Sequence, residues 1–348
     1  AEGAIAIRVL ALGAARPDAA HFTARLRAAL ARREALRGET DAFRAVHGES
    51  DGLAGVTIDV YDRWAVLQTY AAGVDGLGRW AAAWLASELG LAGVLWKPAR
   101  RRVGGASGGA GDGARTTRRL RGAVPDRIAV HEGTGAAARE LTVELCSGQK
   151  SGAFLDLRGL RRWLAAEPLG GARVLNLFAY TGTLGQAAER AGAAALVQVD
   201  ASAAALAVAR AHHVDDPARH RFVVADVFAW LGAAQREQRQ RVAAAPGADR
   251  FDLIIIDPPS MTSRVDQVDG VLGTYRRMYH QAHALLAPGG RMVVACCTSR
   301  VTRARFLQNA DRELTGLARQ AVLATETDHP VGFSEADYLK IAIYGPGG

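Results

Sequence analysis

Polar residues suited to ligand binding recur at intervals through the C-terminal half of this 348-residue chain. The first group is the turn Asn176-Leu-Phe-Ala-Tyr-Thr-Gly182, where Gly182 lets the backbone approach a ligand at the start of a helix. Asp200 follows about 20 residues later, where a carboxylate can accept both hydroxyls of a ribose. Asp226 is placed to reach an adenine amino group, and Asp257-Pro258-Pro259 follows a further apolar run. The turn lacks the GxGxxG pattern that admits a pyrophosphate, which favours a smaller nucleoside-like ligand over a dinucleotide.

Each of these residues has a plainer interpretation when taken alone. Asp200 and Asp226 follow expected strands, where an aspartate commonly caps the N-terminus of the next helix. Asp257-Pro258-Pro259 is compatible with a rigid turn, because proline restricts its own backbone and that of the preceding residue. Their order, one after each of four expected strands, favours a single shared ligand site.

Strands that alternate with helices must position these residues. Continuous apolar runs after residue 173 predict buried strands, and the segments between them show helical spacing. This alternation indicates an α/β fold whose parallel sheet is covered on both faces and binds ligands at the carboxyl ends of its strands. Strands are expected at Val174–Phe178, Leu196–Val199, Arg221–Val224, Leu253–Ile256 and Arg291–Cys296, the last after a Pro288-Gly289-Gly290 turn, and helices at Leu184–Ala191, Ala203–His213 and Tyr275–Leu286.

A smaller α+β domain is expected before this sheet, because the chain is long enough for two domains. Alternating residues between Phe43 and Gln68 predict short strands joined by tight turns. A strand at Ile5–Leu12, a helix at His21–Arg37, a helix at Val74–Leu89 and a strand at Gly93–Trp96 complete the pattern. We expect this domain over residues 1–96, a basic glycine-rich loop over 97–121, completing strands over 122–147, and a catalytic domain over 148–348.

Composition narrows the class of protein. With 49% hydrophobic and 22% charged residues, the chain is typical of a globular protein, and a formal charge of +8 favours a polyanionic partner. Three cysteines are too few for a disulfide framework, which predicts a reducing, cytoplasmic setting. We find no signal peptide and no apolar run long enough to span a bilayer, so no membrane association is expected.

The loop over residues 97–121 combines arginines with a Gly/Ser/Ala-rich centre. Such a stretch cannot offset its ordering entropy by burial, and its charges are compatible with a solvated surface loop. The alternative is contact with RNA phosphates, for which the candidates are Arg101, Arg102, Arg118 and Arg119.

Taken together, the strand-end residues resemble those of the class I S-adenosylmethionine-dependent methyltransferases, which have a Rossmann-like fold with a mostly parallel, seven-stranded sheet. The resemblance implies S-adenosylmethionine as the cofactor and no metal. It implies cofactor contacts by Asn176, Phe178, Tyr180, Thr181, Gly182, Asp200, Asp226 and Asp257, with Phe154 helping to close the site.

A narrower resemblance covers nearly the whole chain. Residues 148–158 (GQKSGAFLDLR) look like a segment of the bacterial 23S ribosomal RNA cytosine-C5 methyltransferases, type I of the large-subunit series. His47–Asp59, the Asp-Pro-Pro turn, His329–Val331 and Tyr338–Lys340 are similar to the same family. This narrower resemblance implies 23S ribosomal RNA as the partner. Members of that family carry an N-terminal PUA RNA-binding module, which we expect to be absent here because the chain begins about where the module would end.

The family's nucleophilic cysteine lies in a Ser-Cys-Ser segment after the fifth strand, and Cys296-Cys297-Thr298 matches it here. The resemblance assigns catalysis to Cys297, since C5 of cytosine becomes nucleophilic only after a thiolate adds to C6. The alternative is a small buried hydrophobe, which we adopt for Cys296. Asp257 is expected to pair with the flipped base, with Pro258, Pro259 and Met261 beside it. Met261 replaces the phenylalanine usual in the family, and Lys150 is either an RNA or cofactor contact or an exposed lysine.

Three other functions share some of these features. A guanine N-methyltransferase has the same Leu-Phe-Ala-Tyr-Thr-Gly and Asp-Pro-Pro signatures but needs no cysteine. A degenerate RNA-binding or assembly protein would keep the fold without catalysis, and methylation of a small molecule stays open because the cofactor motifs do not specify the substrate. The sequence also leaves a homodimer open.

Overall fold

The computed structural model describes residues 8–11, 13, 16–98, 117–134, 138–146, 153–244 and 250–347, with the backbone alone at 239–244. The chain divides into two compact units. The first comprises Ala1–Asp156 and Glu326–Phe333, and the second comprises Leu157–Thr325 and Ser334–Gly348. None of the described helices is both apolar and long enough to cross a bilayer.

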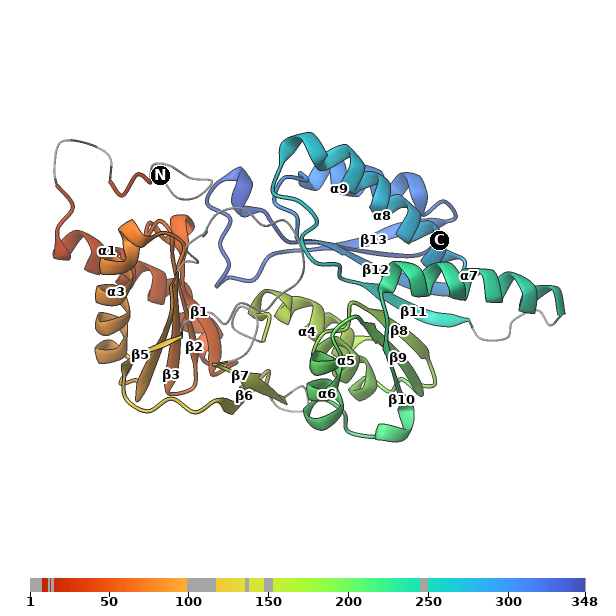
Figure 1. Cartoon of the computed structure of the whole chain (residues 1–348), viewed down its shortest axis with the longest axis horizontal. Coiled ribbons are helices and arrows are strands. Elements are labelled where there is room, and N and C mark those ends of the chain that lie inside the picture. The colour runs from red at the N-terminus through yellow and green to blue at the C-terminus, as the bar shows by residue number, and fades with distance from the viewer. Residues whose placement is uncertain are drawn as a thin grey trace. The chain divides into compact units, whose positions relative to one another are not determined.

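A five-stranded sheet forms the centre of the first unit, in the order β1-β2-β3-β4-β5 (Figure 1). Neighbouring strands are antiparallel except β3 and β4, which run parallel because a helix, α3, crosses between them. The elements are α1 (Ala19–Arg32), α2 (Glu34–Arg37), β1 (Ala42–His47), β2 (Val56–Tyr61), β3 (Trp64–Thr69), α3 (Asp75–Glu88), β4 (Gly93–Lys97), β5 (Arg118–Arg121) and the hairpin β6 (Arg127–Glu132) and β7 (Arg139–Glu144).

Both faces of this sheet are buried, because alternate side chains of a strand enter opposite faces. Leu67 and Trp96 pack in the cluster that α1 and α3 complete. Val66 and Leu95, their immediate neighbours, pack in a second cluster with the hairpin β6–β7. The first unit is therefore a small α+β body with helices on one face and a hairpin on the other.

A seven-stranded sheet forms the second unit, in the order β10-β9-β8-β11-β12-β14-β13 (Figure 1). The first five strands in this order are parallel, whereas β14 is antiparallel to both β12 and β13. The strands are β8 (Arg173–Leu177), β9 (Ala195–Asp200), β10 (His220–Val224), β11 (Phe251–Ile256), β12 (Leu286–Cys296), β13 (Leu317–Leu323) and β14 (Lys340–Pro346). This arrangement confirms the predicted α/β fold with a mostly parallel sheet.

Helices cover both faces of the seven-stranded sheet (Figure 1). Three of them contribute Leu231, Tyr279 and Phe306 to the buried cluster that contains Ile254 and Val294 of the central strands. These helices are α7 (Val227–Ala244), α8 (Val268–His283) and α9 (Arg303–Glu313), and the opposite face carries α4 (Arg158–Ala166), α5 (Thr183–Arg190) and α6 (Ala203–His212).

Three local predictions were wrong. Residues 8–11, the described part of the strand expected at Ile5–Leu12, form no regular secondary structure. The helix expected at His21–Arg37 breaks at Arg33, whose buried guanidinium turns inward to bond Asp51. The helix expected at Tyr275–Leu286 begins earlier and ends at His283, and the expected Pro288–Gly290 turn lies within β12, which bends where Gly289 has a φ of 77°.

Candidate functional site

The carboxyl ends of β8, β9, β10, β11 and β12 lie at one edge of the second unit, because these strands are parallel. The chain builds outward from β8 to β10 on one side and continues through β11 and β12 on the other. Open α/β sheets bind ligands at the crevice beside such a reversal of strand order. The residues that the structure brings to this edge are Asn176, Phe178, Tyr180, Thr181, Gly182, Asp200, Asp226, Asp257, Pro258, Pro259, Met261 and Cys297.

The loop after β8 has an unusual backbone. Phe178 and Tyr180 have φ values of 59° and 48°, in the left-handed region that costs a non-glycine residue roughly 1 kcal/mol or more. Three hydrogen bonds hold this shape: Ala179 N to Val199 O at 3.1 Å, Tyr180 N to Asp200 Oδ2 at 2.8 Å, and Gly182 N to Ala179 O at 2.8 Å. Strain held in this way is typical of ligand sites.

Gly182 begins α5, and only glycine suits this position. Its φ is 78°, and a Cβ atom there would lie 2.8 Å from the Cβ of Ala209. The carbonyl oxygen of Thr181 lies 2.5 Å from Nδ1 of His213, a residue that the sequence analysis did not select. The glycine turn is thus packed directly against α6.

Asp200 ends β9 with both carboxylate oxygens directed at backbone N–H groups. Its Oδ2 accepts from Tyr180 N and its Oδ1 from Ser202 N, both at 2.8 Å. The N-cap of α6 is Ser202, whose hydroxyl accepts from Ala205 N, so the capping interpretation of Asp200 is wrong. Each carboxylate oxygen has further lone pairs, which leaves Asp200 able to accept from ligand hydroxyls.

Asp226 is used differently. It is exposed, and its Oδ1 accepts from Ala229 N at 2.8 Å in the first turn of α7. The capping interpretation is therefore realised for this residue. Because a cap uses one carboxylate oxygen, the second stays available to a ligand.

Asn176 lies at the end of a buried polar network that crosses three strands. Its Nδ2 donates to Gln198 Oε1 at 3.2 Å, Gln198 Nε2 lies 2.9 Å from His220 Nδ1, and His220 Nε2 lies 3.0 Å from Glu189 Oε2. The Oδ1 atom of Asn176 is buried and has no hydrogen-bond partner among the described residues. An unsatisfied buried acceptor costs about 1–3 kcal/mol, so a donor on a bound ligand fits this position.

An aromatic pair adjoins these polar groups. The rings of Phe178 and Phe228 meet edge to face, with centroids 5.8 Å apart. Phe228 is 37% exposed in the first turn of α7, two residues after Asp226. An exposed ring beside polar strand ends is suited to covering a flat heterocycle. Phe228 was not among the predicted site residues, although its position two residues after the second strand-end aspartate could have indicated it.

The loops after β11 and β12 are tied together. The thiol of Cys297 donates to the carbonyl oxygen of Pro258 at 3.3 Å, and Met261 N donates to Thr298 Oγ1 at 3.2 Å. Cys297 and Asp257 are each partly exposed. A thiol and a carboxylate therefore share one small region of the sheet edge.

Cys296 has a different environment from its neighbour. It is fully buried and packs in the same cluster as Tyr275 and Tyr279. Burial, followed by the nearby charge of Cys296, raises the pKa of each tyrosine above its ordinary value. This packing agrees with the interpretation of Cys296 as a small buried residue.

Lys340 supports the loop that carries Cys297. Its fully buried ammonium donates to the carbonyl oxygens of Thr298, Val301 and Asp337, at 3.0, 2.8 and 3.1 Å. Burial lowers the pKa of Lys340, whereas nearby negative charge, including that of Cys297, acts to raise it. Tyr338–Lys340 was part of the family resemblance, but no role was predicted for Lys340.

The remaining predicted residues are placed elsewhere. Arg118 and Arg119 are exposed on β5 of the first unit, where the Arg118 guanidinium lies 5.2 Å from the centre of the Trp96 ring. Phe154 also belongs to the first unit and has a φ of 44°. Arg101, Arg102 and Lys150 lie outside the described residues.

Comparisons with known sequences give a consistent result. A family model for S-adenosylmethionine-dependent methyltransferases matches residues 134–340. The chain is 35% identical to a ribosomal RNA large subunit methyltransferase of Deinococcus radiodurans, over 93% of this chain and 78% of that protein. It is 32% identical to the ribosomal RNA large subunit methyltransferase I of Aeromonas hydrophila, over 93% and 80%.

Solved structures share the fold. One is a methyltransferase complexed with SAH, which is 24% identical, aligns over 96% of this chain and 83% of its own, and gives a TM-score of 0.79. Another, an S-adenosylmethionine-dependent methyltransferase from Streptococcus mutans, is 23% identical over the same shares, with a TM-score of 0.78. The similarity extends over both units of the chain.

Proposed function

Because the chain belongs to the family of S-adenosylmethionine-dependent methyltransferases and uses that cofactor, we propose that its substrate is ribosomal RNA of the large subunit. The relatives from Deinococcus radiodurans and Aeromonas hydrophila carry that substrate in their names. We further propose that the product is 5-methylcytosine in 23S ribosomal RNA and that the reaction takes place in the cytoplasm, where cysteine thiols stay reduced.

The strand-end residues are suited to hold the cofactor. When bound, S-adenosylmethionine supplies an electrophilic methyl group. Asp200 accepts from the ribose hydroxyls, and Asp226 accepts from the adenine amino group. The unpartnered Oδ1 of Asn176 is suited to a donor of the amino-acid part, and the pair Phe178–Phe228 is suited to cover the adenine ring. Phe154 is the remaining candidate for closing the site.

Cys297 carries the proposal for cytosine, through its position beside the Asp257–Pro259 loop. Its thiolate forms a bond to C6 of the base, and the electron pair of the C5–C6 double bond becomes available at C5. When C5 takes the methyl group, the pair of the broken S–CH3 bond would stay on the sulfur of the cofactor. Transfer of the C5 proton to a base would then restore the C5–C6 double bond and expel the thiolate. Asp257 accepts from the exocyclic amine of the flipped base, a contact that distinguishes cytosine.

Contacts to the rest of the RNA are also proposed. Pro258, Pro259 and Met261 surround the base, where Met261 offers a softer surface than an aromatic ring. Arg101, Arg102, Arg118, Arg119 and Lys150 are candidates for phosphate contacts. Because Arg118 and Arg119 are exposed on an edge strand, they are accessible to a phosphate backbone.

The two adjacent cysteines provide a matched experiment. The purified protein is incubated with labelled cofactor and deproteinised 23S ribosomal RNA, and the product nucleosides are identified by mass spectrometry. We expect 5-methylcytidine from the natural protein and from Cys296→Ala. Cys297→Ala should lose at least about 10³-fold in rate, because the covalent route is closed.

Other outcomes separate the alternatives. Methylguanosine that persists in Cys297→Ala would replace the cytosine assignment with a guanine N-methyltransferase. Binding of the cofactor without methylation of any RNA would favour an RNA-binding or assembly role, and methylation confined to small molecules would reject the RNA substrate.

A further inference from the structure

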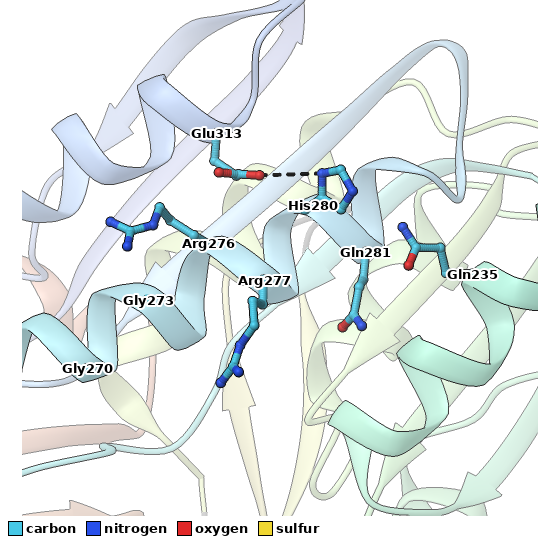
Figure 2. A pocket seen from close by; sticks show the side chains of 8 residues that line it. All are labelled: Gln235, Gly270, Gly273, Arg276, Arg277, His280, Gln281 and Glu313. Atoms are coloured by element: carbon cyan, nitrogen blue, oxygen red, sulfur yellow. Dashed lines mark ion pairs between the residues drawn. The ribbon is translucent and has the colours of Figure 1, made fainter.

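Three neighbouring cavities form a line on the helical face of the second unit. The largest, of about 580 Å³, is lined by α7, α8 and α9 (Figure 2). It shares Arg276 with a cavity of about 240 Å³ and His280 with a cavity of about 440 Å³. Because each neighbour shares a wall residue with the central cavity, the three cavities adjoin along α8, and together they are here called the α8 groove.

Part of the groove follows one stripe of α8, and Arg277 and Gln281 beside that stripe also line the central cavity (Figure 2). Asp269, Gly273, Arg276 and His280 recur at intervals of four, three and four residues, which places them on one face of the helix. Arg305 and Arg312 of α9 line the same groove. From Asp269 to His283 the stripe extends roughly 21 Å at the rise of an α-helix.

Uncompensated positive charge dominates the groove. Asp269 pairs with Arg305, and Glu313 lies 3.5 Å from His280. Arg276 and Arg277 contact only neutral side chains, Asn309 and Thr274. Within the described part of the chain, neither these two arginines nor Arg312 has a carboxylate within ion-pair distance.

One end of the groove adjoins the proposed catalytic edge. α8 follows the loop that begins at Asp257, and α9 follows the loop that contains Cys297. Both helices therefore start at the edge where the strands end, and Asp269 and Arg305 lie in their first turns. A polymer that presents one residue to Cys297 can continue directly into the groove.

We propose that the α8 groove binds the sugar–phosphate backbone of single-stranded RNA next to the modified nucleotide. The inference rests on the proposed RNA substrate and specifies the path of the strand. Proteins that bind single strands combine a positively charged groove with a binding site of about 4 or more nucleotides. The length of the stripe on α8, roughly 21 Å, suits about that number. Gln281 adds an amide group for sugars and bases (Figure 2).

Binding of oligouridine tests the groove apart from the chemistry. A fluorescein-labelled oligouridine of about 12 nucleotides contains no cytosine, so its anisotropy reports affinity whatever base the enzyme modifies. The groove variant is Arg276→Gln/Arg277→Gln/Arg312→Gln. The control is Arg210→Gln/Arg219→Gln/Arg221→Gln, which removes the same charge from exposed positions around α6 and β10.

We expect the groove variant to weaken binding at least about tenfold and to reduce the slope of log affinity against log salt by about 2, since each lost phosphate contact contributes about 0.7. The control should stay within about twofold of the natural protein. Cofactor binding measured by calorimetry should be equal in all three proteins, which verifies that they fold.

Equal weakening in both variants would overturn the groove, because the effect would then reflect net charge alone. Unchanged binding in the groove variant would also overturn it. The same holds if polyglutamate, but not unlabelled oligouridine, displaced the labelled oligouridine from the protein. Loss of 5-methylcytidine formation with intact binding would instead count against the cytosine chemistry and leave the groove standing.

Discussion

His47 is half-buried in the first unit, beside the guanidinium of Arg44 and the ring of His329. Burial, then the charges of Arg44 and His329, lower its pKa from 6.5 to about 3. His47 is thus neutral in the folded protein under ordinary conditions. It contributes to the fold as an uncharged group that accepts from Arg44.

This lowered pKa predicts a loss of stability in acid. Above pH 6.5 neither state protonates His47, whereas between pH 6.5 and 3 only the unfolded state does, so the free energy of unfolding falls as the pH falls. At pH 4.5, two units below 6.5, the loss due to this residue should be roughly 3 kcal/mol. Urea unfolding at pH 7.5 and 4.5 should show a decrease larger by that amount in the natural protein than in His47→Asn. Equal decreases would contradict the shift.

The strand-end aspartates show how residues of one type diverge. Asp200 and Asp226 have the same local pattern, a strand before and a helix after. The structure makes Asp226 a helix cap and gives Asp200 to the backbone of the neighbouring loop. Two contacts distinguish them: Ser202 caps α6 in place of Asp200, and Asp200 bonds Tyr180 N across strands, which no local pattern contains.

At the scale of elements, Lys340 is the first residue of β14, and its side chain connects this strand to the loop after β12 by hydrogen bonds. All three ammonium protons have carbonyl acceptors, an arrangement that suits the charged form. The ammonium thus lies under the loop that carries Cys297, and a positive charge beside a cysteine in general favours the thiolate. Lys340 is therefore a positioning residue for the proposed nucleophile.

Lys340→Met should affect Cys297 in two ways. Three buried carbonyl oxygens lose their donor, which should destabilise the protein by about 3 kcal/mol. The pH at which Cys297 reacts half-maximally with iodoacetamide, followed by mass spectrometry of its peptide, should also rise. Arg300→Met removes an exposed charge from the same loop and should change neither quantity. An unchanged pH profile in Lys340→Met would limit the lysine to a structural role.

At the scale of the whole molecule, the segment Glu326–Phe333 belongs to the first unit although the chain on either side of it belongs to the second. Asp328 Oδ2 accepts from Arg44 N, and the carbonyl oxygen of Asp328 accepts from Arg33 Nη2, both at 3.0 Å. Gly332 N donates to Ser50 Oγ at 3.2 Å. The first unit is therefore complete only after nearly the whole chain is present.

Asp328→Ala should weaken this connection. Arg44 N loses its acceptor, at a cost of about 1–3 kcal/mol, so hydrogen exchange of β1 amides should accelerate although the change lies 284 residues away. Glu335→Ala, at an exposed site just outside the segment, is the control. If protection of β1 were the same in both variants, the segment would not support the first unit.

The sequence by itself determined the alternation of strands and helices, the edge at which polar residues gather, and the family that the comparisons show. These features are local, because hydrophobic spacing and a polar residue at a strand end depend on neighbours along the chain. Elements with weaker patterns, such as α4, α7, α9 and β13, were not predicted. Their apolar residues are few or interrupted by charge, and packing against the sheet decides them.

Only the tertiary structure decided how the site is supported. The buried network behind Asn176, the ammonium of Lys340 under the Cys297 loop and the groove between α8 and α9 join residues from separate elements. Their partners are chosen by the order and register of strands, and these depend on long-range pairing. The sequence could therefore nominate candidate residues for binding and reaction, whereas the fold determined what holds them in place.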